Sequence, residues 1–489
     1  MRRHFFNPWR SFGRIVALAL ALTFIVPSPL VISPAKAELF DFTMTDEKKL
    51  GEKFNVLMRA KLSMIDDSEV VDYVNDLVQR LGKVAPLPPF KLSAAVVRDN
   101  SVNAFAAPAG YVFVFSGLIL NMDHDAEVAG VLAHEISHVS QRHIAKRMQQ
   151  GTYMSIAAML GTLAGLALGA VTKNSNAGAA VAAGSQAAAT QSMLNYSRED
   201  EREADEVGMT RLVEAGYNPK GLPDSFAVLR KLQVLQGAAT GGIPPYLSTH
   251  PGIAERIDYL NERVRRMPPD VVSRPANDER FLRVQTIIRS LYSDPKAAIA
   301  WYLKKGQAMT KIDHLGLAIA LGRTTNNDGA RQAFDIALKE SGNDALCLRE
   351  AGAFYLRMRD FDKARALLGA AVAANPRDMT ASAGYAQILG QDGRNAEALA
   401  LFRRVIANMP ASVAAHQMVG RVYGQTGDMF HAYLNLAYAA VYSNNPGQSK
   451  MNIDKTKGYA KTDDDRRELA TLEQVFKDRS QYWPKPGVF

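Results

Sequence analysis

The stretch VLAHEISHVSQRH, residues 131–143, contains three of the nine histidines of the chain. His134 and His138 are four residues apart, which is about 400° of α-helix, so both imidazoles leave the same helix face about one turn apart. Two ligands of one metal ion need this spacing. Glu135 stands beside the first histidine, where its carboxylate can reach a water on the metal and act as a general base. The stretch therefore predicts a metal site on a helix; polar residues on an ordinary surface helix are the alternative.

The flanking residues predict where this helix begins and ends. Asp123 is a suitable N-cap, and acidic residues follow it in the first turn, which favours a helix N-terminus. We expect the helix to continue to about Arg147. His143 is five residues after His138 and about 140° further around such a helix, so we expect it to point away from the metal site.

A catalytic zinc ion takes three protein ligands and leaves its fourth position to water. A third histidine six residues after the second is excluded, because Ile144 stands at that position. A carboxylate from another helix is the next candidate, and the run SREDEREAD, residues 197–205, contains five acids. The spacing alone does not select one of them. Runs of charge are most often solvated surfaces, and we expect this for Glu199, Asp200 and Glu203.

Short runs of β-forming residues predict a small sheet before the metal helix. Tyr111–Phe115 is a dense run of aromatic and valine residues after the turn-like Pro108–Gly110, and Phe90–Val97 alternates as a strand does. From Asp46 to Lys83 the apolar residues follow helical spacing, and a proline-rich segment then interrupts it. These elements predict an α+β domain that is mainly helical and contains a small β-sheet.

A repeat with a period of 34 residues runs through the C-terminal part of the chain. Small residues recur at Gly352, Ala386 and Gly420, and aromatic or leucine residues, alanines and prolines keep the same phase. A weaker copy occupies 311–344, and three units match well: 345–378, 379–412 and 413–446. The pattern resembles the tetratricopeptide repeat, an all-α solenoid whose stacked helix pairs leave a groove able to hold another chain. A helical domain without a binding role is the alternative.

The length of 489 residues suggests roughly two to four domains. A proline-rich stretch after Arg266 separates the metal-site region from the repeats and reads as a linker. We therefore expect four parts: a signal peptide at 1–37, a metal-site domain at 38–267, a linker at 268–278 and the repeat domain at 279–489.

The N-terminal residues predict export. A basic segment ends at Arg14, an apolar segment follows from Ile15 to Val26, and Ala35–Ala37 has the small residues of a cleavage site. A retained membrane anchor and a mitochondrial presequence are the alternatives, and the apolar segment is short for a membrane span of about 20 residues. The chain has one cysteine, Cys347, so no internal disulfide can form. We expect a soluble, exported protein.

The formal charge of +9 does not indicate nucleic-acid binding. Residues 1–37 carry five basic residues and no acid, so the remainder holds 9 − 5 = +4, without a basic stripe interleaved with aromatics. Residues 153–171 are uncharged and carry glycines four residues apart, a spacing that lets helices pack closely. We expect a buried helix that covers the metal helix; a hairpin in peripheral contact with a membrane is the alternative.

Two motifs together carry a family resemblance. H-E-x-x-H at 134–138, followed by R-x-x-E-x-x-A-D at 198–205, resembles the zinc metallopeptidase family of the CAAX prenyl protease and HtpX. The resemblance implies a gluzincin-like domain with one Zn²⁺ per chain, held by His134, His138 and Glu201. It implies that Glu135 is catalytic and that Asp205 orients a ligand histidine, and Asp205 shares a helical face with Glu201.

Two further segments extend the resemblance. Asn103–Ala106 with Gly110 resembles the family loop N-A-F-A-x-P-G-G, except that Ala109 replaces its first glycine. The edge of the strand after this loop is implied to flank the cleft, where an unfolded substrate could pair with it. His250 before a proline, followed by Arg256, resembles a loop whose histidine can take the open position of the zinc and hold the enzyme inactive. A regulatory or transition-state role for His250 is therefore implied.

Together with the export signal and the repeats, the resemblance implies a secreted, periplasmic zinc-dependent endopeptidase. Its implied role, partly chaperone-like, is quality control and assembly of outer-membrane proteins. The implied partners are unfolded or misassembled outer-membrane proteins and, through the repeats, the barrel-assembly machinery. The main alternative is a chaperone or adaptor scaffold with a latent zinc site gated by His250. A membrane-embedded protease that uses residues 153–171 is a third hypothesis, and it predicts retention in the membrane pellet after salt or alkaline washing.

Overall fold

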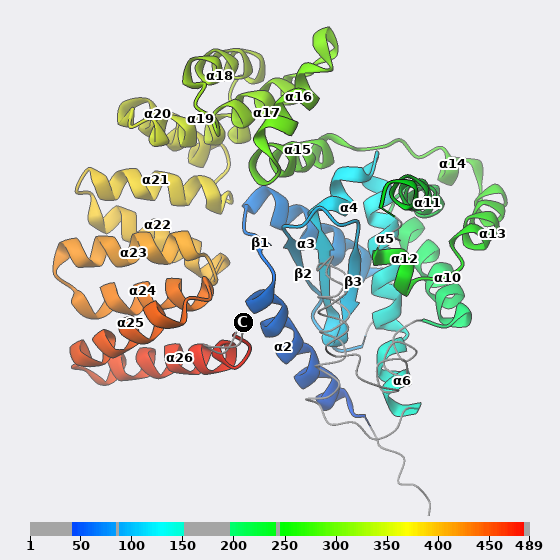
Figure 1. Ribbon diagram of the computed structural model, residues 1–489, viewed down its shortest axis with the longest axis horizontal. Coiled ribbons are helices and arrows are strands. Elements are labelled where there is room, and N and C mark those ends of the chain that lie inside the picture. Colours follow the sequence, from blue (N-terminus) through cyan, green and yellow to red (C-terminus); the bar gives the residue numbers. More distant parts are fainter. Residues whose placement is uncertain (1–41, 85–87, 151–195, 241–244, 484–489) are drawn as a thin grey trace, which may run out of the picture. The chain divides into compact units, whose positions relative to one another are not determined.

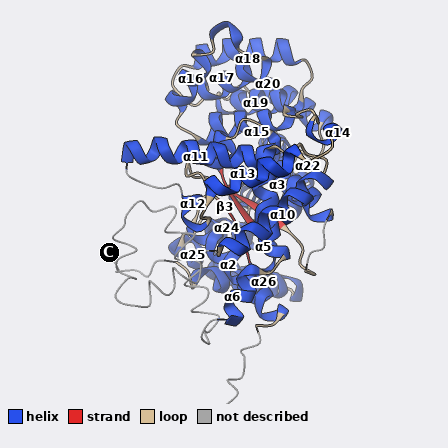
Figure 2. Cartoon of the chain, turned by 90° about the vertical axis from the view of Figure 1, so that its right-hand side faces the viewer, coloured by secondary structure: helices blue, strands red, loops and turns tan. Residues whose placement is uncertain are grey.

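The computed structural model describes residues 42–84, 88–150, 196–240 and 245–483. The expected signal peptide and the apolar segment 153–171 lie outside these ranges. Helices make up most of the described residues, and the strands are confined to one small sheet (Figure 2). Over the described ranges, no helix combines the length and the apolar character needed to cross a bilayer. The expected fold class, a mainly helical α+β domain followed by an all-α repeat region, is confirmed.

The N-terminal part contains the sheet and the helices packed on it (Figure 1). Its strands are β1 (Met64–Ile65), β2 (Ser93–Val97), β3 (Ala104–Ala107) and β4 (Tyr111–Phe115), with the 3₁₀ turn η2 (Pro108–Gly110) before β4. Its helices are α2 (Met44–Lys61), α3 (Ser68–Lys83), α4 (Ser116–Asn121), α5 (Asp125–Ser140), α6 (His143–Gln150), α10 (Arg198–Glu214), α11 (Gly221–Thr240), α12 (Pro245–Thr249) and α13 (Ile253–Arg265).

The strands lie in the order β1-β2-β4-β3, with β2 and β4 parallel and the other neighbours antiparallel. Because successive strand residues face opposite sides, β4 contributes to two layers. Val112 and Val114 join the core that includes α3 and α5. Phe113 faces the other side, where it stacks on Phe105 of β3 and meets Phe54 of α2 edge to face. The sheet is therefore covered by helices on both faces.

The expectation that the strand from Tyr111 has the free edge was wrong, because β4 pairs with β2 on one side and with β3 on the other; β3, which the sequence suggested only as a loop, is the edge strand. Alanines are weak β-formers, but pairing with β4 from Ala104↔Val114 to Ala107↔Tyr111 satisfies the backbone groups of β3 on one side. β2 starts at Ser93 rather than at Phe90, because its parallel partner begins at Tyr111, opposite Ser93. The other side of β3 stays free of strand partners within the described residues.

The helix expected from Asp123 to Arg147 is in fact two helices, α5 and α6. At the start, His124 rather than Asp123 is the N-cap, and the backbone N–H of Asp123 donates to the Glu127 carboxylate at 2.7 Å. At the break, Arg142 has a φ of 54°, a left-handed conformation that ends a right-handed helix. The Arg142 guanidinium pairs with Glu47 of α2 at 2.9 Å. This contact with a distant helix accompanies the change of direction, which the spacing along α5 cannot reveal.

The C-terminal part consists of helix pairs that contact one another in sequence order (Figure 1). It opens with α14 (Pro269–Val272), which lies in the expected linker, then α15 (Glu279–Ile287), the π-helical turn η3 (Ile288–Tyr292), α16 (Pro295–Leu303) and the 3₁₀ turn η4 (Gly306–Ala308). The pairs are α17 (Lys311–Leu321) with α18 (Asn327–Ser341), α19 (Ala345–Arg357) with α20 (Phe361–Ala374), α21 (Met379–Gln391) with α22 (Asn395–Asn408), α23 (Val413–Thr426) with α24 (Met429–Tyr442), and α25 (Pro446–Tyr459) with α26 (Asp463–Ser480).

The recurring small residues explain how the two helices of a pair come together. The first helices of four successive pairs start 34 residues apart, at 311, 345, 379 and 413. A Cβ on Gly352 would lie 2.7 Å from Cγ of Leu368, and a Cβ on Gly420 would lie 2.9 Å from the carbonyl oxygen of Ala432. Glycine at this phase therefore permits the close approach that buries the apolar faces.

The repeat region contacts the N-terminal part through a buried ionic group, and both belong to one compact unit, Phe42–Phe489. Arg349 of α19 is 1% exposed and lies 2.9 Å from Asp67, 2.7 Å from Glu350 and 3.2 Å from Asp378. We call these four residues the Arg349 cluster. Asp67 is also the N-cap of α3. Burial raises the pKa of Asp67 to about 6, although Arg349 opposes this change.

The last helix of the repeats returns to the N-terminal part. α26 contacts α2, and Arg479 donates to the backbone carbonyl of Arg59 at 3.0 Å. Ala60 at the end of α2 shares an apolar cluster with Phe430 of α24 and with Trp483. The described repeat array is thus attached to α3 near its middle and to α2 at its end.

Candidate metal centre

Four side chains from three segments of the chain meet at α5. His134 and His138 come from this helix, Glu201 comes from α10, and His250 follows α12. One ligand atom from each lies within 4.8 Å of all the others, and none of the four residues is more than 2% exposed. The structure thus brings together the three expected ligands and the loop histidine.

The distances between these donor atoms fit a single tetrahedral ion. Donors about 2.0–2.1 Å from one zinc ion in this geometry lie about 3.3 Å from one another. The two Nε2 atoms of His134 and His138 are 3.0 Å apart, and each is 3.6 Å from a Glu201 oxygen. Nδ1 of His250 is 2.9 Å from Glu201 and 3.3 Å from His134. Imidazole nitrogens and a carboxylate are also the donor types that zinc prefers.

Packing between helices fixes the position of the Glu201 side chain. Ser197 begins α10 as its N-cap, with a reciprocal capping box to Asp200. About two turns after Glu201, Gly208 faces α5, and a Cβ at this position would lie 3.2 Å from both the Cα and the N of His134. The absence of a side chain at Gly208 therefore lets α10 lie close enough for Glu201 to reach the histidines.

Asp205 lies behind His134, on the side away from the other ligands. Its Oδ1 is 2.9 Å from Nδ1 of His134. Arg256 of α13 donates to both oxygens of Asp205 at 2.7 Å and also contacts Glu201, while the Tyr259 hydroxyl donates to Asp205. Burial alone would raise the pKa of Asp205, but Arg256 and then His134 hold it well below its usual value. Asp205 therefore stays ionised and can fix the orientation of His134.

Arg256 and Tyr259 were not expected as functional residues. Arg256 is 3% exposed, and burial would raise the pKa of Glu201, but His250 and Arg256 lower it overall. The sequence gives no direct signal for this role, because a buried arginine is identified by its partners, and these lie on another helix. The only available signal was its place in the loop resemblance.

Glu135 lies between the ligand group and the edge strand. Its Oε2 accepts the backbone N–H of Ala106 in β3 at 3.1 Å, and its Oε1 is 3.5 Å from Nε2 of His250. Glu135 is 1% exposed. The carboxylate is therefore oriented by the edge of the sheet on one side and faces the centre on the other.

His250 is held by aromatic rings and by carboxylates. Its ring stacks on Tyr246 at 4.4 Å and on Tyr196 at 5.2 Å between centroids. Burial alone would lower the pKa of His250, but Glu201 and Glu135 raise it overall. These contacts hold the imidazole at the fourth corner of the donor group.

His143 does not point away from the centre, so this expectation was wrong. Because α5 ends before Arg142, the rotation of 100° per residue does not continue to His143. Its Nδ1 is 2.8 Å from Nδ1 of His138, and its Nε2 is 3.1 Å from Glu203. The expectation of a solvated residue was wrong for Asp200, which is half-buried and pairs with Arg147, whereas Glu203 is exposed as expected although it also contacts His143. Glu199 is exposed, as expected.

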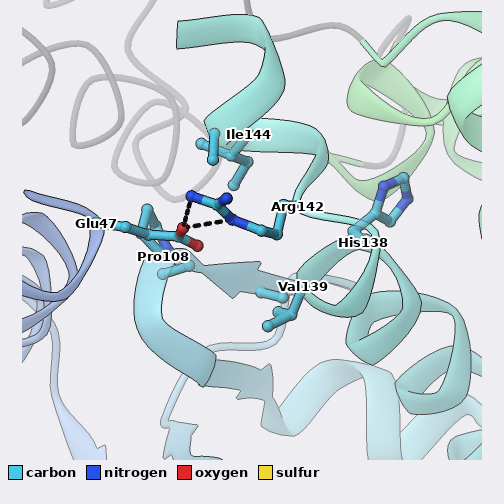
Figure 3. A pocket seen from close by; sticks show the side chains of 9 residues that line it. Glu47, Pro108, His138, Val139, Arg142 and Ile144 are labelled. Atoms are coloured by element: carbon cyan, nitrogen blue, oxygen red, sulfur yellow. Dashed lines mark hydrogen bonds and ion pairs between the residues drawn. The ribbon is translucent and has the colours of Figure 1, made fainter. Parts of the chain in front are cut away.

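A hollow of about 230 Å³, which includes space open to solvent, lies beside His138 (Figure 3). The Glu47–Arg142 ion pair crosses its wall. Its other lining residues come from the end of β3, from η2 and from the residues around the α5–α6 break: Ala106, Ala107, Pro108, Val139, Ile144 and Ala145. The break in the helix and the edge strand thus border the same small space.

Comparisons with known proteins agree with this geometry. Residues 68–264 match the model of peptidase family M48, and residues 350–413 match a tetratricopeptide-repeat model. A Vibrio cholerae serotype O1 chain, provisionally named a beta-barrel assembly-enhancing protease, is 32% identical over 63% of this chain and 62% of its own. The beta-barrel assembly-enhancing protease of Escherichia coli K12 is 31% identical over 46% of this chain and 45% of its own. The matches span less than two thirds of either relative.

A solved structure titled MamA AMB-1 covers 32% of this chain and 95% of its own at 20% identity, with a TM-score of 0.27. The assignment to a family comes instead from the family models and from the motif residues on α5 and α10. Residues 68–264 of this chain are a peptidase family M48 domain, and tetratricopeptide repeats follow it.

Proposed function

We propose that this chain is a zinc-dependent endopeptidase whose metal is held by His134, His138 and Glu201. The observation that carries the proposal is the convergence of these side chains at donor distances that fit one tetrahedral ion. The family M48 domain supports it. When bound, zinc supplies Lewis acidity toward the peptide carbonyl and toward water.

Glu135 is the residue that moves the proton in this proposal. Its Oε2 is anchored by the N–H of Ala106, and its Oε1 faces the ligand group. A carboxylate held in this way can accept a proton from the attacking water and deliver it to the leaving amine. Its burial keeps bulk water away from that proton.

The edge of β3 is the proposed binding site for the substrate backbone. One side of β3 pairs with β4, and its other side has no strand partner within the described residues. An extended peptide can add to such an edge through main-chain hydrogen bonds. Unfolded proteins are therefore the substrate class that this edge favours.

We propose further that the protein acts in the periplasm on unfolded or misassembled outer-membrane proteins, with a chaperone-like role as well. The names of the relatives, which refer to beta-barrel assembly, support these clients, and the N-terminal sequence supports export. The repeat array would recruit clients or the barrel-assembly machinery, because stacked helix pairs offer an extended surface to another chain.

The test is metal content together with cleavage of casein by the purified mature chain. We expect one zinc ion per chain, loss of cleavage after chelation, and recovery when zinc is restored. A protein that binds no transition metal, or one whose cleavage survives chelation, would exclude the proposal.

The variant His250→Ala is expected to cleave casein faster than the wild type. His250 lies at the fourth corner of the donor group and 3.5 Å from Glu135, where it competes with water and substrate. If His250 blocks the site in roughly nine of ten protein molecules, its removal raises the rate of casein cleavage about tenfold. The control is His416→Ala, a buried histidine of α23 outside the site. A loss of activity in His250→Ala would instead assign His250 a part in the reaction.

The second candidate is a chaperone or adaptor with a latent zinc site, and the position of His250 in the donor group favours it. The two functions separate in cells. If a Glu135→Gln strain behaves like the wild type while deletion of the repeats removes all function, the scaffold is the working part.

A further inference from the structure

The two ring nitrogens of His138 face different partners. Its Nε2 lies near His134 and Glu201, so this atom would bind the metal. Its Nδ1 must then carry the hydrogen, and that N–H needs an acceptor. Nδ1 of His143 lies 2.8 Å from it. An imidazole that carries its own hydrogen on Nε2 presents a lone pair at Nδ1, so His143 can accept this bond.

The other side of the His143 ring supports the same tautomer. Its Nε2 lies 3.1 Å from Oε2 of Glu203 and 3.8 Å from Oδ1 of Asp200. Carboxylates accept hydrogen bonds, so the hydrogen of His143 belongs on Nε2. A continuous set of donors therefore runs from His138 to His143 and from His143 to Glu203.

The two helix histidines are thus supported in parallel ways. A histidine that binds a metal almost always donates its second N–H to a carboxylate, a carbonyl or water, which fixes the ring and raises its basicity. His134 has a carboxylate directly, through Asp205 at 2.9 Å. His138 reaches one through His143. Burial of His143, which is 0% exposed, shields this contact from competing water.

The break at Arg142 makes this contact possible. In a continuous helix, His143 would be about 140° from His138. The left-handed backbone at Arg142 separates the end of α5 from the start of α6. The ion pair with Glu47 holds Arg142 in place. The chain therefore leaves α5 at the point that turns His143 back onto the ligand.

We infer that His143, fixed by Glu203, is a positioning residue that orients His138 and strengthens its bond to the metal. This inference rests on the proposed function, because it requires His138 to be a ligand. The alternative is that His143 only fills space in the interior.

The experiment measures the zinc affinity of the mature chain by competition with a chelator at fixed pH. His143→Phe keeps the ring but removes the acceptor, and we expect zinc binding to weaken by about 10- to 100-fold. His143→Asn places a carbonyl oxygen near the position of Nδ1, and most of the affinity should return. Glu203→Gln keeps an acceptor without the charge, and we expect an intermediate loss.

A second readout follows the ligand itself. In the Co²⁺-substituted protein, the visible absorption bands of His143→Phe should differ from those of the wild type, since the His138 ring is no longer held. His416→Phe is the matched control, because His416 is buried and loses ring hydrogen bonds to Asn435 and to the Pro410 carbonyl. Melting curves of the metal-free proteins report folding separately.

The outcomes separate the two proposals. If wild type binds zinc and cleaves casein, and His143→Phe matches it in affinity and in cobalt spectrum, only the positioning role is overturned. The positioning role is also overturned if His143→Asn binds zinc as weakly as His143→Phe. Restoration of a hydrogen-bond acceptor would then have no effect on zinc affinity. If wild type binds no metal, the proposed function itself fails.

Discussion

Replacement of Glu135 by glutamine should lower the rate of casein cleavage by about 10²- to 10⁴-fold, the usual contribution of a general acid–base residue. Glutamine has nearly the same shape and can still accept the Ala106 N–H through its carbonyl oxygen. It cannot take a proton from water. Because Glu135 is not in the donor group, the variant should bind zinc as the wild type does.

The measurement pairs initial rates with metal content in the same samples. Glu199→Gln is the matched control, since Glu199 is exposed and belongs to the acidic run that also supplies Glu201. Its rate should equal that of the wild type. A Glu135→Gln protein that keeps its zinc and still cleaves casein at a comparable rate would remove the proton-transfer role from Glu135.

Replacement of Arg349 by methionine should destabilise the folded chain by about 3–5 kcal/mol, the usual cost of breaking a buried ion pair from one side. Arg349 is 1% exposed and faces Asp67, Glu350 and Asp378. Methionine fills much of the volume but leaves these carboxylates without a cation. Because Asp67 caps α3, the damage should extend to the contact between the peptidase domain and the repeats.

The free energy of unfolding, measured by urea denaturation, reports this loss. Arg365→Met is the control, because Arg365 pairs with Asp362 and Asp392 on the surface and its removal should change little. Adding Asp67→Asn and Asp378→Asn to Arg349→Met should recover stability, since fewer buried charges then lack a partner. An Arg349→Met protein as stable as Arg365→Met would show that the cluster does not hold the two parts together.

Features set by local spacing could be predicted from the sequence. The positions of His134, Glu135 and His138 follow from the period of one helix, and Tyr111–Phe115 forms the expected strand. The 34-residue phase predicts where the helices of the repeats begin, because each pair depends mainly on its neighbours.

Features set by contacts between distant segments could not be predicted in this way. Arg142 ends α5 where it meets Glu47, some 95 residues earlier in the chain, so the extrapolation to His143 failed. β3 is a strand because β4 pairs with it, not because alanines favour extended backbone. Arg256 acquires its role from carboxylates on another helix.

The C-terminal part contacts the peptidase domain at several places: α15 packs on α3, the Arg349 cluster meets α3, and Arg479 of α26 meets the end of α2. An array held at several places along its length can bend less freely than an array held at one end. Any change in the curvature of the repeat array on capture of another chain must therefore be taken up as strain on α2 and α3. α2 also carries Glu47, which pairs with Arg142 at the α5–α6 break. Strain on α2 would therefore act on the turn that positions His143.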